Sequence, residues 1–424
     1  VNEYKKPHQF VTNNFDFEWR GYSYGVQPDV NHFKAAKKLT MAGVDIYHPT
    51  QDDLTGAEIA FGGDMTRSLK RDNYLVLETE AQGYPGWTPY KGQLRLQGYS
   101  HLASGSNSVM YWHWHSIHNS FETYWKGLLS HDMQENAPYR EACIMGKEFS
   151  EIGSHLVNLK KKNDVAILVS NEALTALKWF GIEATAAGNN GIGYNDVVRW
   201  IYDALYQMNI ECDFVWPESD NLEQYKAIFV PALYAAPDEL LERLKQYVAD
   251  GGTLVATFKT AFANENIKVS HEMQPHILSN CFGINYQQFT FPKNVGLTGS
   301  IIRESGADEA DKKNETKEII ESILENLLVK KRPNQSSAFF YKAVNSLNID
   351  GLMAIDHRPI WSFFLPRKRR GVTNGKNADY RCLHPFVGIK NRTVLVIDRL
   401  DLGTLDITNP QPDLGNRIKN LIRR

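Results

Sequence analysis

Apolar runs that end in polar or aromatic side chains recur along the first 135 residues. Four of them predict strands, at residues 9–15, 42–47, 74–78 and 108–114. Segments with helical spacing, such as residues 30–39, lie between them. This alternation is typical of a parallel β/α architecture. Four such units make half of a (β/α)8 barrel, which normally needs about 250 residues.

The run at 74–78 organises this part of the chain. It ends in Glu78 and leads into the loop Gly83-Tyr-Pro-Gly-Trp87. Barrel enzymes present an acid or a nucleophile where a buried strand hands its last side chain to a loop. We therefore expect the chemistry at Glu78, against the alternative of a solvated carboxylate at a strand end. Glu80 lies two rises of about 3.3 Å further along and is expected to be a rim or structural carboxylate.

The next 150 residues predict a second α/β unit. A helix at 138–160 leads into it, and its own helix at 194–208 is expected to be capped near Tyr194 or Asn195. A further helix opens at Pro237-Asp238 and ends at Gly251-Gly252, where glycine suits the left-handed position. The predicted strands are at 164–170, 211–215, 227–230 and 253–258. This order predicts a flavodoxin-like doubly wound module.

The last third of the chain is harder to assign. Its pattern predicts a charged helix at 305–331 and strands at 338–341, 360–365 and 393–398. We expect an α/β protein in three parts. They are a partial barrel with strands five to eight over 1–158, a doubly wound domain over 159–300 and a β-rich α+β segment over 301–424.

Composition excludes several classes of protein. With 424 residues, 42% of them hydrophobic, the chain can bury two or three substantial cores. A formal charge of −2 gives no electrostatic footprint for nucleic acid. No apolar run approaches the roughly 18 residues of a membrane span, and no signal peptide is visible, so we expect a cytoplasmic protein. The four cysteines lack C-x-x-C spacing, which indicates neither zinc nor a disulfide framework.

Aromatic side chains gather around the predicted strand ends. Trp87, Trp112, Trp114 and Trp125 suit the stacking of sugar C–H faces on indole rings, although core packing explains any one of them equally well. His113, His115 and His118 offer no third ligand at suitable spacing, so no metal is expected. The segment 188–193 resembles a phosphate loop but lacks its Lys-Ser/Thr, which favours a flexible connector.

Order and spacing together resemble glycoside hydrolase family 42, the β-galactosidases. Val11-Thr-Asn-Asn-Phe15 is similar to the family's fifth barrel strand and Val44-Asp-Ile-Tyr47 to its sixth. Leu77-Glu78-Thr79 resembles the nucleophile strand, and the match continues through Phe121-Glu122 to Leu129-Ser-His131. The doubly wound segment resembles the family's trimerisation domain, at 230–234 and 247–253.

The resemblance implies a retaining β-galactosidase with Glu78 as nucleophile, no organic cofactor and a homotrimeric assembly. Glu122 is the candidate for holding a pair of sugar hydroxyls, because a carboxylate in an aromatic setting needs polar partners. Trp87, Trp112 and Trp125 are further substrate-binding candidates. Asn14 and Asp45 are candidates for orienting the substrate or the nucleophile, with a turn or capping role as their alternative.

Two departures from the family pattern keep other functions open. The family usually has His where this chain has Trp125, which leaves room for a retaining β-glycosidase of different sugar specificity. The family's acid/base is a Glu preceded by Asn, and Asn2-Glu3 stands too close to the next strand for a crossover helix. We therefore expect the acid/base upstream of this chain. A catalytically incomplete fragment that only binds sugar and assembles is the remaining alternative.

Overall fold

The computed structural model describes ten stretches of the 424-residue chain. They are residues 1, 3–20, 23–48, 56–82, 88–182, 184–185, 188–189, 193–286, 386–390 and 393–397. The chain divides into two compact units. The first unit is Val1–Asn163 with the short segment Glu211–Phe214, and the second unit begins at Asp164 and holds the other described residues.

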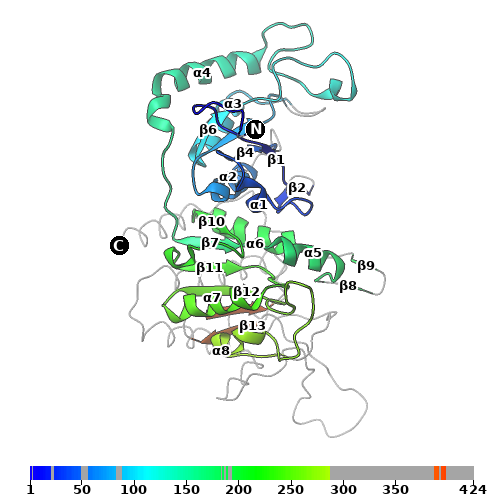
Figure 1. Ribbon diagram of the computed structural model, residues 1–424. Coiled ribbons are helices and arrows are strands. Elements are labelled where there is room, and N and C mark those ends of the chain that lie inside the picture. Colours follow the sequence, from blue (N-terminus) through cyan, green and yellow to red (C-terminus); the bar gives the residue numbers. More distant parts are fainter. Residues whose placement is uncertain are drawn as a thin grey trace, which may run out of the picture. The chain divides into compact units, whose positions relative to one another are not determined.

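A four-stranded parallel sheet is the centre of the first unit (Figure 1). Its strand order is β1-β4-β5-β6, which is also the order of these four strands along the chain. The strands are β1 (Asn14–Phe15), β4 (Gly43–Asp45), β5 (Tyr74–Glu78) and β6 (Ser106–Val109). All three pairings are parallel. The predicted half-barrel arrangement is confirmed.

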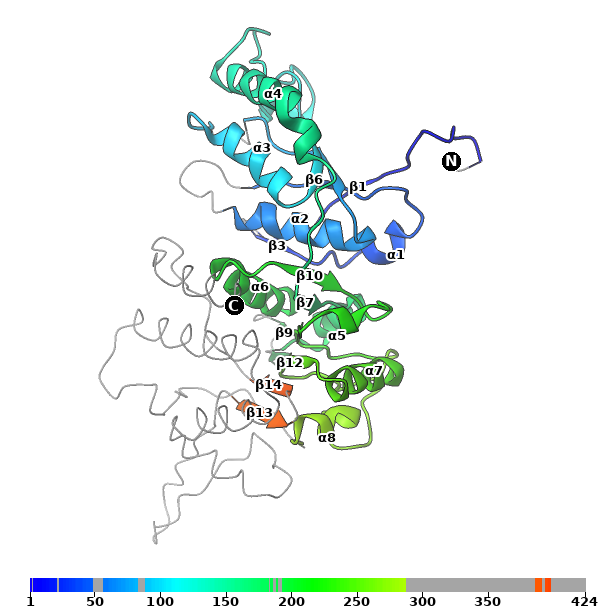
Figure 2. The ribbon, with the colours of Figure 1, turned by 90° about the vertical axis from the view of Figure 1, so that its left-hand side faces the viewer.

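Helices follow the strands of the first unit. Helices α2 and α3 pack against each other and against β4, β5 and β6, and α4 lies along α3 (Figure 2). The bounds are α1 (His32–Ala36), α2 (Ala57–Lys70), α3 (Gln93–Ala103) and α4 (Ala137–Leu156). The predicted helices at 30–39 and 138–160 are confirmed as α1 and α4. A short hairpin, β2 (Glu18–Trp19) with β3 (Tyr24–Gly25), and a 3₁₀ turn, η2 (Phe121–Tyr124), complete this unit.

Local chemistry explains where these elements begin. Asn31 caps α1 by accepting from the Lys34 N–H, and Asn136 caps α4 by accepting from the Tyr139 N–H. Each cap satisfies one of the N–H groups that a helix start leaves unpaired. The strand interiors are fully buried, with Val44 and Val76 at 0% exposure. Burying an apolar side chain of this kind contributes about 1.5–3 kcal/mol, so the sheet's core holds the strand ends in register.

The second unit is built on a mostly parallel sheet, ordered β10-β7-β11-β12-β14-β13 (Figure 1). Its strands are β7 (Val165–Leu168), β10 (Cys212–Val215), β11 (Ala227–Val230), β12 (Thr253–Thr257), β13 (Phe386–Lys390) and β14 (Thr393–Ile397). The pairings β7–β11, β11–β12 and β12–β14 are parallel, and β13 runs antiparallel to β14. The helices are α5 (Asn171–Trp179), α6 (Tyr194–Gln207), α7 (Asp238–Ala249) and α8 (Ser279–Phe282), with 3₁₀ turns η3 (Leu222–Gln224) and η4 (His276–Leu278). The predicted doubly wound module is confirmed.

Both predicted helix ends are confirmed. The cap of α6 was predicted near Tyr194 or Asn195, and it lies one residue before Tyr194. Gly193 is the N-cap, and its backbone N–H donates to the Asp196 carboxylate at 2.6 Å, while Tyr194 and Asn195 are buried helical residues. The end of α7 is confirmed, because Gly251 has φ +102° just past the helix, a conformation that costs glycine little.

Parts of the predicted chain lie outside the described residues. The predicted strand at 393–398 is confirmed as β14, which pairs in parallel with β12. The helix at 305–331 and the strands at 338–341 and 360–365 fall outside the described residues. The domain boundaries at 158 and 300 and the β-rich segment over 301–424 stay predictions. The segment 188–193 contains β9 (Gly188–Asn189), which pairs with β8 (Ala184–Thr185).

Candidate active site

Two carboxyl groups stand side by side at the carboxyl ends of β4 and β5. Asp45 is the last residue of β4, Glu78 is the last of β5, and the two are register partners across the parallel pair. The Ile46 N–H donates to the Glu78 carbonyl at 2.9 Å, which continues the pairing past the strand ends. Parallel barrels keep their catalytic groups at this edge of the sheet. The sheet therefore presents Glu78 where a nucleophile is expected.

A tyrosine orients the Glu78 carboxylate. The Tyr47 hydroxyl donates to Glu78 Oε2 at 2.8 Å. Burial raises the pKa of Tyr47 far above its ordinary value, and the hydrogen bond to Glu78 raises it further. The phenol therefore keeps its proton above its ordinary pKa and acts as a hydrogen-bond donor to Glu78. A charge-assisted bond of this type restricts the carboxylate to one orientation.

Asp45 has a different environment from Glu78. It is 8% exposed, and its Oδ2 accepts from the Asn14 side-chain amide at 3.0 Å. Burial raises the pKa of Asp45 to about 7, and the charge of Glu78 adds to this effect, while the hydrogen bond from Asn14 opposes it. Asn14 and Asp45 thus meet at the strand ends, as their candidacy for orienting groups in the site requires.

Glu80 lies past the end of β5 and is 4% exposed. Its Oε1 accepts from the His48 backbone N–H at 2.9 Å and lies 3.1 Å from His48 Nδ1. The Thr79 hydroxyl donates to its other oxygen at 3.3 Å. Burial raises the pKa of Glu80, and its contacts with His48 and Thr79 oppose that shift. Three donors on one buried carboxylate indicate a structural clamp, and His48 directly follows Tyr47.

Gln97 of α3 completes this clamp from the helix side. Its Nε2 lies 2.9 Å from His48 Nε2 and donates to the Thr79 hydroxyl at 2.9 Å. An amide N–H₂ can only donate, so His48 Nε2 accepts and the proton resides on Nδ1, facing Glu80. The His48 ring thereby links α3 to the Glu80 carboxylate. We call Glu80, His48, Gln97 and Thr79 the rim clamp.

Aromatic rings form a wall beside the nucleophile candidate. The Tyr47 ring lies 5.4 Å from the Trp125 ring and 6.0 Å from the Trp19 ring, measured between centroids. Trp19 is 50% exposed and also meets the Tyr24 ring edge-on at 5.1 Å. Indole faces of this kind suit the C–H faces of a sugar. Trp125, a predicted site residue, thus lies next to Tyr47, whose hydroxyl donates to Glu78.

The remaining predicted site residues have varied placements. Trp112 pairs with Glu80 in an isolated parallel bridge, with its N–H donating to the Thr79 carbonyl at 2.8 Å, and its side chain is half-buried. Glu122 is half-buried in η2, and the Trp125 N–H donates to its carbonyl at 2.9 Å. Trp87 lies outside the described residues. Trp114 is 58% exposed and packs on Tyr139.

Tyr47, His48 and Trp19 were not among the predicted site residues. Tyr47 closes the predicted strand 42–47, where its ring counts as one more apolar residue and its hydroxyl gives no periodic signal. His48 belongs to the site only through Glu80, which lies 32 residues later. Trp19 belongs to a two-residue strand, too short to register as a pattern. These three residues join the site through contacts with residues far away in the sequence.

The histidines after β6 form a chain of ring contacts. His113, His115, His118 and His131 follow one another with centroid distances of 6.5, 6.1 and 5.7 Å. Within the described ranges no group of three His, Cys, Asp or Glu side chains is placed to hold a metal ion. In the same ranges no helix is both long and apolar enough to cross a bilayer.

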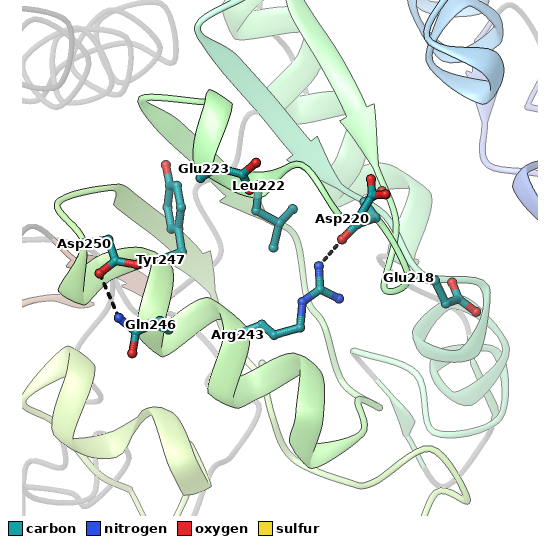
Figure 3. A pocket seen from close by; sticks show the side chains of 9 residues that line it. Glu218, Asp220, Leu222, Glu223, Arg243, Gln246, Tyr247 and Asp250 are labelled. Atoms are coloured by element: carbon teal, nitrogen blue, oxygen red, sulfur yellow. Dashed lines mark hydrogen bonds between the residues drawn. The ribbon is translucent and has the colours of Figure 1, made fainter.

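The second unit has a pocket of about 350 Å³ beside α7 (Figure 3). Carboxylates dominate its lining, at Glu218, Asp220, Glu223 and Asp250. Its cation, Arg243, donates from Nη1 to the Pro217 carbonyl at 2.8 Å and from Nη2 to the Ser219 carbonyl. The guanidinium therefore anchors the loop after β10. This pocket offers neither an oriented nucleophile nor an aromatic wall.

A carboxylate at a parallel strand end, oriented by a tyrosine and flanked by indole rings, is typical of glycoside hydrolases built on (β/α)8 barrels. Comparison with known families agrees. Residues 3–152 match the family model described as "Beta-galactosidase", and residues 163–324 match the "Beta-galactosidase trimerisation domain". These two stretches therefore match the two domains of the glycoside hydrolase family 42 β-galactosidases.

Curated relatives carry the same name. The chain is 28% identical over 284 residues to β-galactosidase BgaB of Geobacillus sp. strain Y412MC61, a match that covers 62% of this chain and 41% of the relative. It is 28% identical over 294 residues to β-galactosidase BgaA of Clostridium cellulovorans, which covers 67% of this chain and 42% of the relative. The chain thus spans about two fifths of the length of the curated relatives it matches.

Solved structures agree at the level of the fold. Gan42B, a family 42 β-galactosidase from G. stearothermophilus, matches with a TM-score of 0.62 and 25% identity over 68% of this chain and 43% of its own. The β-galactosidase from Bacillus circulans sp. alkalophilus matches with a TM-score of 0.60 and 26% identity over 69% of this chain and 43% of its own. These folds support a partial barrel followed by the trimerisation domain.

Proposed function

We propose that this chain carries the nucleophile half of a retaining β-galactosidase site, with Glu78 as the nucleophile. The observation that carries the proposal is the hydrogen bond from Tyr47 to Glu78 at the carboxyl end of β5. In a retaining glycosidase a carboxylate attacks the anomeric carbon and forms a glycosyl-enzyme intermediate, which water then hydrolyses. Glu78 attacks, the aglycone leaves, and the sugar is held as an ester on Glu78 Oε1.

The candidate site residues have the following roles in the proposed reaction. The Tyr47 hydroxyl holds Oε2, so that Oε1 is the attacking atom. The aromatic wall of Trp19, Tyr47 and Trp125 receives the apolar face of the sugar. Glu122, in the turn that precedes Trp125, is our candidate for two sugar hydroxyls, and Trp112 and Trp87 complete the sugar-binding set. We assign the acid/base role to none of the described residues.

The nucleophile assignment has a direct chemical test. In Glu78→Gly the missing carboxylate leaves space for azide to attack the anomeric carbon from the same side. With 2,4-dinitrophenyl β-galactoside, whose leaving group needs no protonation, the product expected is α-galactosyl azide, identified by the NMR coupling of its anomeric proton. Formation of β-galactosyl azide would contradict the assignment. So would release of dinitrophenol by the variant without azide at the wild-type rate.

Trp125 supports a second candidate, a retaining β-glycosidase acting on another sugar. Its ring contacts Tyr47 at 5.4 Å, at a position where the family usually has a hydrogen-bonding His. An indole can replace that bond only by stacking. Dinitrophenyl β-galactoside, β-glucoside and α-L-arabinoside compared on the full chain separate the two candidates. The galactosidase proposal expects the highest kcat/KM for the galactoside.

We further propose that the second unit assembles the chain into a homotrimer. The basis is the match of residues 163–324 to the trimerisation-domain model. Light scattering on the full chain, coupled to size exclusion, is expected to give a mass three times the 48.3 kDa of one chain. A mass of one chain that does not rise over a tenfold range of concentration would contradict this assignment.

A further inference from the structure

Asp45 is a buried carboxyl group that the proposed reaction does not yet use. It lies next to the nucleophile candidate in the parallel register of β4 and β5, and it is 8% exposed. Two carboxylates so close together at one sheet edge cannot both be ionised at low cost, since each disfavours the charge of the other. Glu78 therefore opposes the ionisation of Asp45, which is the more buried of the two.

The hydrogen bonds of the pair identify which carboxyl holds the proton. Glu78 is half-buried and receives the Tyr47 hydroxyl, a donor that stabilises its charge. Asp45 is buried and receives only the neutral Asn14 amide, on Oδ2. Within the described part of the chain, Asp45 Oδ1 is buried and has no hydrogen-bond partner. A buried oxygen without a partner costs free energy unless a ligand or water satisfies it.

Among the described residues, the other groups that face Asp45 add no positive charge. From β1 and the residues after it come Asn14 and Asp16, from β5 comes Glu78, and from its own loop comes the Tyr47 hydroxyl. Glu80, further along, is held by His48 in the rim clamp. The negative charges of Glu78 and Asp16 both oppose ionisation of Asp45.

We propose that Asp45 acts as a neutral carboxylic acid that donates a hydrogen bond from Oδ1 to an oxygen of the bound sugar, leaving Glu78 as the charged partner. This rests on the proposed glycosidase function. It makes Asp45 a substrate-binding acid and not the acid/base, because Asp45 and Glu78 project from adjacent strands and do not flank a bond from opposite sides. Burial and Glu78 together bring the pKa of Asp45 to about 7, so this donor is lost as the pH rises through neutrality.

The sign of the pH dependence follows directly. Below pH 7 Asp45 carries its proton and sugar binding has its donor. Above pH 7 the proton leaves, and the resulting carboxylate faces sugar oxygens as an acceptor beside a second negative charge. If the donor is required, capture of a sugar falls about tenfold for each pH unit above the pKa.

The test uses the full chain and a 2-deoxy-2-fluoro-β-galactoside with a dinitrophenyl leaving group. Mass spectrometry follows the second-order rate of covalent labelling from pH 5 to pH 9. The wild-type rate is expected to fall through a midpoint near pH 7. In Asp45→Asn the side chain stays neutral and keeps an N–H₂ donor, so the decline is expected to disappear. A decline that persists unchanged in Asp45→Asn would overturn the proposal.

A second variant keeps the test decisive if Asp45→Asn fails to fold. Asn14→Ala removes the hydrogen bond that favours the ionised form of Asp45, so the midpoint is expected to move to higher pH. A midpoint that stays in place or moves lower contradicts the inference. Absence of labelling in the wild type at every pH would contradict the glycosidase function itself. Labelling without a neutral-pH decline contradicts only the role of Asp45.

Discussion

The chain builds two largely parallel sheets, and we assign the proposed chemistry to the carboxyl end of the first. In the first unit, β4 and β5 end in Asp45 and Glu78, and loop residues add Tyr47 and indole rings. In the second unit, β11 ends in Val230 and is followed by Pro231 and Ala232, both without a reactive group. Ligands of α/β proteins bind at the carboxyl ends of parallel strands. Both sheets have such an edge, and the side chains at the strand ends determine which edge is suited to chemistry.

Satisfaction of polar groups distinguishes the two kinds of carboxylate within the first unit. Glu80 is enclosed and receives three donors, which describes a structural group. Asp45 keeps a buried oxygen that, within the described residues, has no hydrogen-bond partner. This free acceptor or donor position is the basis of the proposed contact with a ligand. Burial alone does not distinguish the two carboxyl groups, because both are less than a tenth exposed. The hydrogen-bond inventory separates the rim clamp from the site.

The largest expected effect is on Glu78. Replacing it with Gln removes the nucleophile while keeping its shape and its hydrogen bond from Tyr47. The rate of dinitrophenyl β-galactoside hydrolysis is expected to fall by at least about 10³-fold. Glu242→Gln serves as the control, because Glu242 lies in an exposed pair with Lys245 on α7. Equal rates in the two variants would place the chemistry elsewhere.

The rim clamp gives the next largest effect, on stability. Glu80→Ala removes the acceptor of two His48 hydrogen bonds from the interior. The free energy of unfolding is expected to fall by roughly 2–4 kcal/mol in urea titrations. Glu242→Ala, at an exposed ion pair, is expected to change it by no more than about 0.5 kcal/mol. A loss from Glu80→Ala as small as the control's would show that the clamp is dispensable.

Tyr47→Phe tests whether the wall residue orients the nucleophile. The ring and its contacts with Trp19 and Trp125 are retained, and only the hydroxyl at 2.8 Å from Glu78 is lost. One charge-assisted hydrogen bond contributes about 1.5–3 kcal/mol, so fluorosugar labelling is expected to slow by roughly 10- to 100-fold. Unchanged labelling, with the melting temperature preserved, would remove Tyr47 from the mechanism.

The smallest expected effect concerns Lys259 of the second sheet and the pH dependence of stability. Lys259 follows β12, is 3% exposed and donates to the Gly181 carbonyl at 3.2 Å. Burial lowers the pKa of Lys259 to about 8, against about 10.4 in an unfolded chain. The unfolded state therefore keeps a proton that the folded state releases between these values, and stability rises with pH there.

Lys259→Met is expected to lose that rise and to label with fluorosugar at a rate within about twofold of the wild type. Urea unfolding at pH 7.5 and pH 9.5 measures the first effect. The same pH response in both proteins would contradict the folded pKa. A large loss of labelling would mean that the second sheet takes part in the chemistry.

Much of the fold follows from periodicity. The strand at Tyr74–Glu78 and the helix Asp238–Ala249 are long enough, and clearly enough bounded, to be predicted from the sequence. The exact cap residue of α6, Gly193, depends on Asp196 reaching back to its N–H, a contact made three residues into the helix that periodicity does not reveal. The packed α2 was not predicted, since it is buried along nearly its whole length and lacks a clear polar face.

The site was predictable only in part. Glu78 was expected from a strand that ends in a carboxylate, and Asp45 and Asn14 from the ends of their own strands. Tyr47, His48 and Trp19 depend on contacts between loops of separate βα units, and such contacts leave no periodic trace in one sequence. The resemblance to family 42 located the strands, and the hydrogen bonds give each side chain its role.

The central claim is that Glu78 is the group that captures the sugar. The most direct measurement is peptide mapping of the full chain after reaction with the dinitrophenyl 2-deoxy-2-fluoro-β-galactoside. The account predicts one fluorogalactosyl adduct, on the peptide that contains Glu78, and none in Glu78→Gln. An adduct on another carboxylate, or none after exhaustive incubation of a folded chain, would contradict it.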